Sequence, residues 1–120
     1  MKFEEYRQFD AIGLADLVAR GEVTAVELLE LAIARADAVN PQLNGLIIPL
    51  YDMAREQATG PLSGPLAGVP MLVKDLFQEI GGAPNYQGNK ARKASDVHAQ
   101  RDSSCVIGHS CITCPRGCLT

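Results

Sequence analysis

The feature that most constrains the fold is a long amphipathic pattern between residues 24 and 40. Thr24 and Glu27 have the three-residue spacing of a capping box, in which each side chain binds the backbone N–H of the other residue at a helix start. Asn40-Pro41 predicts the helix end, because proline disfavours helical backbone in the residue before it. At about 100° per residue, one broad face collects Leu28, Leu29, Ala32, Ile33, Ala36 and Val39. Such a helix needs other elements to pack against.

A shorter helix is predicted before this one. Asp10 is a suitable N-cap, and Gly21 is typical of the residue that ends a helix. Between them Leu14, Leu17 and Val18 share one face. The sequence therefore predicts two consecutive helices, each with one apolar side.

Short apolar runs follow the helices. Residues 46–50 and 71–73 predict buried strands, with Pro49 at the end or edge of the first, and residues 52–57 predict a short helix. Alternating glycine and proline over residues 60–65 predict a break in regular structure, and residues 96–100 predict one or two helical turns. This order of elements favours the α/β class. Two or three strands would leave most faces and edges of a sheet uncovered, and we therefore expect an incomplete sheet. The alternative is a small independent α+β domain.

Charge and hydropathy exclude several classes of function. The net charge is −3 and the pI is about 5.3, so no basic surface indicates binding to nucleic acid or to an anionic membrane. The longest apolar runs are far too short to span a bilayer. The acidic N-terminus has no apolar stretch after it and is not typical of a secretory signal. We therefore expect a cytoplasmic protein.

Residues 64–75 carry the most specific motif, Gly-Pro-Leu-Ala-Gly-Val-Pro-Met-Leu-Val-Lys-Asp. It resembles the G-P-L-x-G-V-P-x-x-V-K-D stretch of the amidase-signature hydrolases. The resemblance extends back through residues 40–44 to Asp10 and forward to about Ser103, and it is greatest to the branch that includes 6-aminohexanoate-cyclic-dimer hydrolases. It implies that residues 1–103 are the N-terminal portion of an amidase domain, with the N-terminal helices and first strands of a mixed α/β sheet.

The resemblance implies a catalytic role for Lys74. In this family a strand delivers a lysine that deprotonates a serine nucleophile through a bridging second serine, the Ser-cisSer-Lys triad. A lysine amine with its usual pKa of about 10.4 is protonated at neutral pH, and burial lowers the pKa and makes the neutral base accessible. Asp75, on the opposite side of the strand, is expected to make a structural hydrogen bond. The alternative for Lys74 is a solvated strand end.

The serines of that triad are not recognisable in this sequence. In the family they lie downstream, and Ser63, Ser95, Ser103, Ser104 and Ser110 stand in no Gly/Ser-rich signature. The resemblance thus implies an amide C–N bond hydrolase that acts on a small-molecule amide without a cofactor, and that is inactive without its nucleophile. The alternative is a non-catalytic interaction fragment that pairs with a complementing chain.

Two other segments depart from the family pattern. Residues 84–89 match a Pro-Thr-Thr-x-Gly-Ser-like turn of the family only in outline, and His98 is interpreted as an exposed helix residue. All four cysteines fall in residues 104–120, an unrelated tail that we expect to be disordered. A cramped zinc site with His109 and a redox Cys-x-x-C are alternatives that the spacing and Pro115 disfavour. We interpret the tail as the result of a frameshift near Ser103 or of an interrupted gene.

Overall fold

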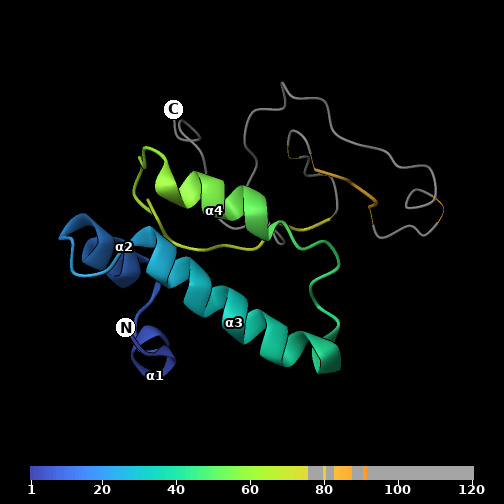
Figure 1. The fold of residues 1–120 in the computed structure, drawn as a ribbon, viewed down its shortest axis with the longest axis horizontal. Helices are drawn as coiled ribbons and strands as arrows, with labels where there is room; N and C mark the ends of the chain where they lie inside the picture. Colours follow the sequence, from blue (N-terminus) through green and yellow to red (C-terminus); the bar gives the residue numbers. More distant parts are fainter. Residues whose placement is uncertain (76–79, 81–82, 88–90, 92–120) are drawn as a thin grey trace.

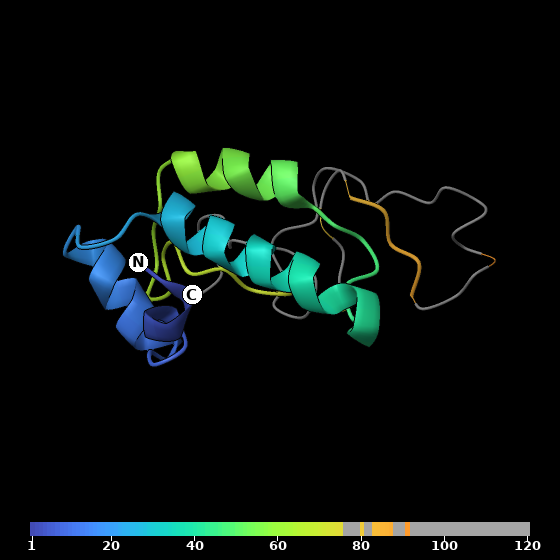
Figure 2. The same cartoon turned by 60° about the horizontal axis from the view of Figure 1, so that its bottom comes forward.

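The computed structural model describes residues 1–75, 80, 83–87 and 91. In this part of the chain α4 lies along α3, and α2 lies beside the N-terminal end of α3 (Figures 1 and 2). The helices are α1 (Phe3–Tyr6), α2 (Ala11–Ala19), α3 (Ala25–Leu43) and α4 (Tyr51–Thr59). Sequence patterns predicted α2, α3 and α4 but not the single turn of α1.

The capping box predicted at the start of α3 is confirmed. The Thr24 hydroxyl accepts a hydrogen bond from the Glu27 N–H at 3.2 Å, and the Glu27 carboxylate accepts one from the Thr24 N–H at 2.8 Å. The Thr24 hydroxyl also donates to this carboxylate at 2.9 Å. These contacts pair N–H groups that the helix itself cannot satisfy, and they lower the pKa of Glu27, mainly through the backbone hydrogen bond from Thr24.

Loss of the capping box should destabilise the chain in a pH-dependent way. We expect Thr24→Ala to lower the free energy of unfolding by about 1 kcal/mol at neutral pH. Because the folded-state pKa of Glu27 is depressed, its charge stabilises the fold above the usual glutamate pKa, and this contribution is lost as the pH falls through the folded value.

Urea unfolding of Glu27→Gln at about pH 7 and about pH 3 measures this dependence. The stability difference from the parent chain should shrink at the lower pH. Glu56→Gln, at an exposed glutamate of α4, is the matched control and should show little effect at either pH. A constant difference for Glu27→Gln would contradict the assignment of this carboxylate to the cap.

The end of α3 lies three residues beyond the predicted one. The helix continues through Pro41 and ends at Leu43; the C-cap Asn44 has left-handed backbone (φ +49°) and donates its N–H to the Asn40 carbonyl at 2.7 Å. Proline costs most in a helix interior, where it breaks the hydrogen-bond ladder; here it lies in the last turn. The prediction that Asn40-Pro41 ends the helix is therefore wrong.

Residues 46–50 do not form the predicted strand, and Asn40 binds the first of them. Its side-chain amide donates to the Leu46 carbonyl at 3.0 Å and accepts from the Leu46 N–H at 2.8 Å. Both backbone groups of Leu46 are thus engaged by a side chain instead of a neighbouring strand. Within the described residues no strand is formed, and single bridge residues stand at Val73 and Pro84. The predicted sheet is not confirmed.

The shorter helix matches its prediction closely. The Asp10 carboxylate accepts the Gly13 N–H at 2.8 Å as the N-cap of α2. At the other end Gly21 has φ +72°, and its N–H and that of Glu22 bind the carbonyls of Val18 and Leu17 at 3.0 Å each. This pairing is a Schellman motif, which glycine permits because it lacks a Cβ atom.

Most of the buried apolar side chains fall into two clusters, and α3 contributes to both. One joins α2 to α3 and contains Leu14, Leu17, Val23, Leu28 and Val69. The other joins α3 to α4 and contains Ala25, Leu29, Ile33, Ala54 and Ala58. Leu28 and Leu29 are completely buried, so successive residues of α3 supply the two cores.

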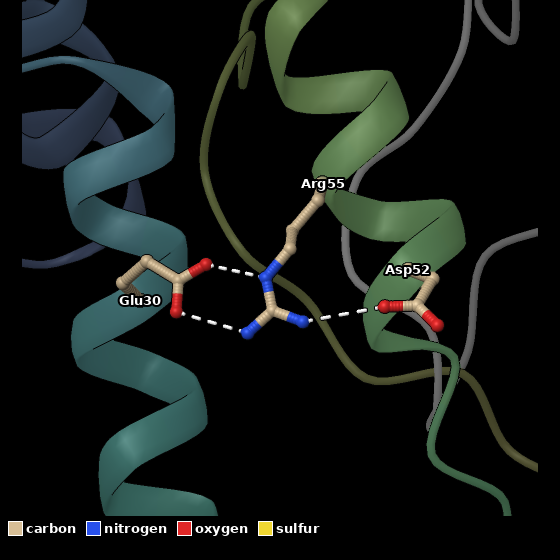
Figure 3. A network of polar contacts seen from close by, with 3 residues as sticks. All are labelled: Glu30, Asp52 and Arg55. Atoms are coloured by element: carbon tan, nitrogen blue, oxygen red, sulfur yellow. Dashed lines mark hydrogen bonds and ion pairs between the residues drawn. The ribbon is translucent and has the colours of Figure 1, made fainter.

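Polar contacts also join α3 to α4. The Arg55 guanidinium makes two hydrogen bonds to the Glu30 carboxylate, at 2.6 and 3.1 Å, and a weaker one to Asp52 at 3.4 Å (Figure 3). Further along, the Tyr51 hydroxyl donates to Asp37 at 2.9 Å. These pairs show that the two helices run antiparallel. Because the side chains are exposed, we assign them a small contribution to stability.

The remaining residues of the predicted apolar face of α3 are only half-buried and border a groove. Together with residues 70–72 they line this groove of about 500 Å³, with Ala32, Ala36 and Val39 on one side and Met71 and Leu72 on the other. Leu72 is 48% exposed. In the part of the chain that the structure describes, no helix has the length and apolar character needed to cross a bilayer.

Candidate functional site

The Gly-Val-Pro motif positions the segment that carries Lys74. Gly68 has left-handed backbone (φ +80°), and a Cβ atom there would lie 3.0 Å from the side chains of Ala25 and Val18. Only glycine therefore lets the chain pass so close to α2 and α3. The next residue, Val69, is buried in the α2–α3 core. This packing fixes where the apolar segment 69–73 begins.

Lys74 lies at the end of this segment and is exposed. Val73, directly before it, is buried with 8% of its surface accessible. The burial expected for a family base is therefore not seen for Lys74 among the described residues. No described residue forms a hydrogen bond or an ion pair with the Lys74 ammonium.

The predicted structural role of Asp75 is confirmed. Its Oδ1 atom accepts the backbone N–H of Tyr86 at 2.8 Å and that of Gln87 at 3.0 Å. The bonded residues are 11 and 12 positions away in sequence. Asp75 thereby ties the end of the lysine segment to residues 83–87, a connection that no sequence pattern indicated.

A small cavity lies beside Lys74. Its volume is about 20 Å³, and it is lined by apolar side chains from three segments together with Lys74 and Asp75. The other lining residues are Ile48, Leu50, Val73, Ile80, Ala83 and Pro84. Lys74 therefore borders an apolar hollow formed by segments from both sides of it in the sequence.

The other candidate residues do not join Lys74. Ser63 is exposed in the turn-rich segment after α4 and does not line the cavity. Ser95, His98, Ser103 and the cysteine tail, with the predictions made for them, lie outside the described residues. Over the described residues no three histidine, cysteine, aspartate or glutamate side chains form a cluster that could hold a metal ion.

Comparison with known proteins gives consistent matches. No family model matches the chain. A 6-aminohexanoate-cyclic-dimer hydrolase from a Pseudomonas strain is 45% identical over 94 residues, which cover 78% of this chain and 19% of the hydrolase. This chain therefore spans about one fifth of the length of that relative.

Solved structures agree with this match. The structure of 6-aminohexanoate cyclic dimer hydrolase superposes with a TM-score of 0.73 at 45% identity, again over 78% of this chain and 19% of that one. A bacterial aryl acylamidase described as an amidase-signature enzyme superposes with a TM-score of 0.67 at 33% identity, over 76% of this chain and 20% of that one.

Proposed function

Because this chain belongs to the amidase-signature family over 78% of its length, we propose that it supplies the lysine base of an amide-bond hydrolase. The observation that carries the proposal is the position of Lys74, which follows buried Val73, precedes the anchored Asp75 and borders an apolar cavity. In the proposed reaction the neutral amine accepts the proton of a bridging serine, which in turn accepts that of the nucleophilic serine. The substrate class is a small amide.

The proposed reaction requires further amidase sequence. A lysine alone forms no acyl-enzyme. Both serines and the N–H groups that stabilise the oxyanion therefore have to come from the part of the relatives' amidase domain that lies outside the match to this chain. The open apolar groove between α3 and residues 70–72 supports this view. In a domain about five times as long, other segments would cover such a surface.

Formation of a sheet in a whole domain is the way in which we expect Lys74 to become buried. We propose that residues 71–75 form a strand once neighbouring strands flank them, as expected for an α/β amidase domain. Strands that cover the cavity would then exclude water from the Lys74 amine and shift its protonation equilibrium toward the neutral form. The exposed state of Lys74 in this chain and its role as a base in a whole domain are therefore compatible.

A hybrid enzyme tests the proposal. The segment of the 6-aminohexanoate-cyclic-dimer hydrolase that matches this chain is replaced by the corresponding residues of this chain, and hydrolysis of the cyclic dimer is measured. We expect the hybrid to be active, because 45% identity and a TM-score of 0.73 leave the backbone of the segment nearly unchanged. A hybrid that is folded by circular dichroism, binds substrate and has no activity would contradict the proposal.

A further inference from the structure

We propose that Asp75 is a positioning residue for the lysine site: it holds residues 83–87 in place and thereby sets the direction in which Lys74 leaves the backbone. The inference rests on the proposed function, because it assigns the task of orienting the proposed base. The proposed role of Asp75 is to act through Lys74 and not on the substrate itself. The contacts of one carboxylate oxygen carry it.

The geometry of these contacts is that of an anion held by consecutive amides. One oxygen, Oδ1 of Asp75, accepts the N–H groups of two successive residues, Tyr86 and Gln87, at 2.8 and 3.0 Å. Successive backbone N–H groups that converge on one point form a concave site for negative charge. Hydrogen bonds to an ionised acceptor are stronger than neutral ones, so this contact fixes both partners in position.

The segment that receives the carboxylate is held at several points. Gln87 has left-handed backbone (φ +51°), which is uncommon for a residue with a side chain. Asn85 and Ala83 are buried, with 3% and 2% of their surfaces exposed. A turn with unfavourable backbone and buried neighbours keeps one conformation only where its surroundings determine it, and Asp75 supplies two of the hydrogen bonds that do so.

The link to Lys74 follows from its place in the chain. Lys74 directly precedes Asp75 and both line the same small cavity, so a carboxylate fixed at position 75 restricts the backbone from which the amine at position 74 extends. The same contact brings Ala83 and Pro84 to the cavity that Val73 and Lys74 also line. Removal of the carboxylate would therefore free Ala83 and Pro84, which form part of the cavity wall, to move. It would also allow the backbone to rotate at Lys74.

The first test uses the whole chain and does not depend on catalysis. Amide hydrogen exchange measured by NMR should show at least about tenfold faster exchange at Tyr86 and Gln87 in Asp75→Ala than in the parent chain. Asp52→Ala is the control, since Asp52 is an exposed aspartate that pairs only weakly with Arg55. Unchanged protection of both amides in Asp75→Ala would overturn the proposal, even if the hybrid enzyme proved inactive.

The second test separates positioning from a general loss of stability. In the hybrid hydrolase, Asp75→Ala should lower kcat about 10- to 100-fold with little change in KM, because small displacements of a catalytic group cost rate rather than binding. The midpoint of the pH–rate limb that reports ionisation of the lysine should also shift. Asp75→Asn keeps an Oδ1 acceptor and should recover most of the rate.

The outcomes distinguish the two proposals. An active hybrid that depends on Lys74, but whose kcat and pH profile are unaffected by Asp75→Ala, would reject the role of Asp75 and leave the proposed function intact. A hybrid in which Lys74→Ala is fully active would reject the proposed function instead. Faster exchange together with a fall in kcat and rescue by asparagine would support the positioning role.

Discussion

Replacement of Lys74 by alanine in the hybrid hydrolase is expected to lower kcat by about 10²- to 10⁴-fold, the range that a positioned general base contributes. The alanine variant has no group at this position to accept the serine proton, and a neutral serine hydroxyl is a weak nucleophile. Because Lys74 is exposed in this chain and makes no polar contact within the described residues, its removal should leave the melting temperature of the isolated chain nearly unchanged.

A second variant separates charge from basicity. Lys74→Arg keeps a positive charge at the same position, but the guanidinium stays protonated at any accessible pH and cannot act as a base. We therefore expect Lys74→Arg to be nearly as inactive as the alanine variant. Stopped-flow or steady-state assays of cyclic-dimer hydrolysis measure kcat for the alanine and the arginine variants. Substantial activity in the arginine variant would show that position 74 contributes charge rather than proton transfer.

Replacement of Gly68 by alanine is expected to cause the largest loss of stability, about 2–4 kcal/mol. Two effects combine at this position. The φ of +80° penalises any residue with a Cβ atom, and that atom would lie 3.0 Å from carbons of both Ala25 and Val18. To relieve the contact, the segment has to move away from α2 and α3, and Val69 then leaves the α2–α3 core.

Gly64 provides the matched control for this substitution. It also has positive φ, at +100°, but a Cβ atom there would meet nothing within 4 Å. Gly64→Ala should therefore cost only the backbone contribution of about 1–2 kcal/mol. Urea unfolding followed by circular dichroism measures both, and thermal unfolding of the hybrid enzyme serves if Gly68→Ala does not fold in the isolated chain. Equal losses for the two variants would contradict the packing role of Gly68.

Local sequence patterns predicted the helices well. The Thr24–Glu27 capping box and the Asp10 cap appear as expected, with Gly21 in the left-handed conformation after α2. These features depend on residues at most five positions apart, so the sequence contains all the information needed to form them. The apolar face predicted for α3 is confirmed in part, since Leu28 and Leu29 are buried but Val39 borders the open groove.

Particular contacts at the end of α3 account for the predictions that failed. Residues 46–50 have the composition of a strand, but the Asn40 side chain occupies both backbone groups of Leu46. Pro41 indicated a helix end, yet its place in the last turn and the left-handed Asn44 allow α3 to continue. Neither outcome follows from composition or periodicity, because each depends on where the chain goes after α3.

The candidate site likewise combines features that the sequence predicted with features that only the structure showed. Its motif and its family were readable from residues 64–75, because the glycine-proline pattern before an apolar run is specific enough to indicate them, and the proposal for Lys74 rests on the same motif. The exposure of Lys74 and the partners of Asp75 came only from the folded chain. Burial is a property of everything that surrounds a side chain, and hydrogen bonds across 11 or 12 residues require a turn whose path no local preference dictates. Sequence thus determined which groups this protein brings to the site, and tertiary structure decided how they are held.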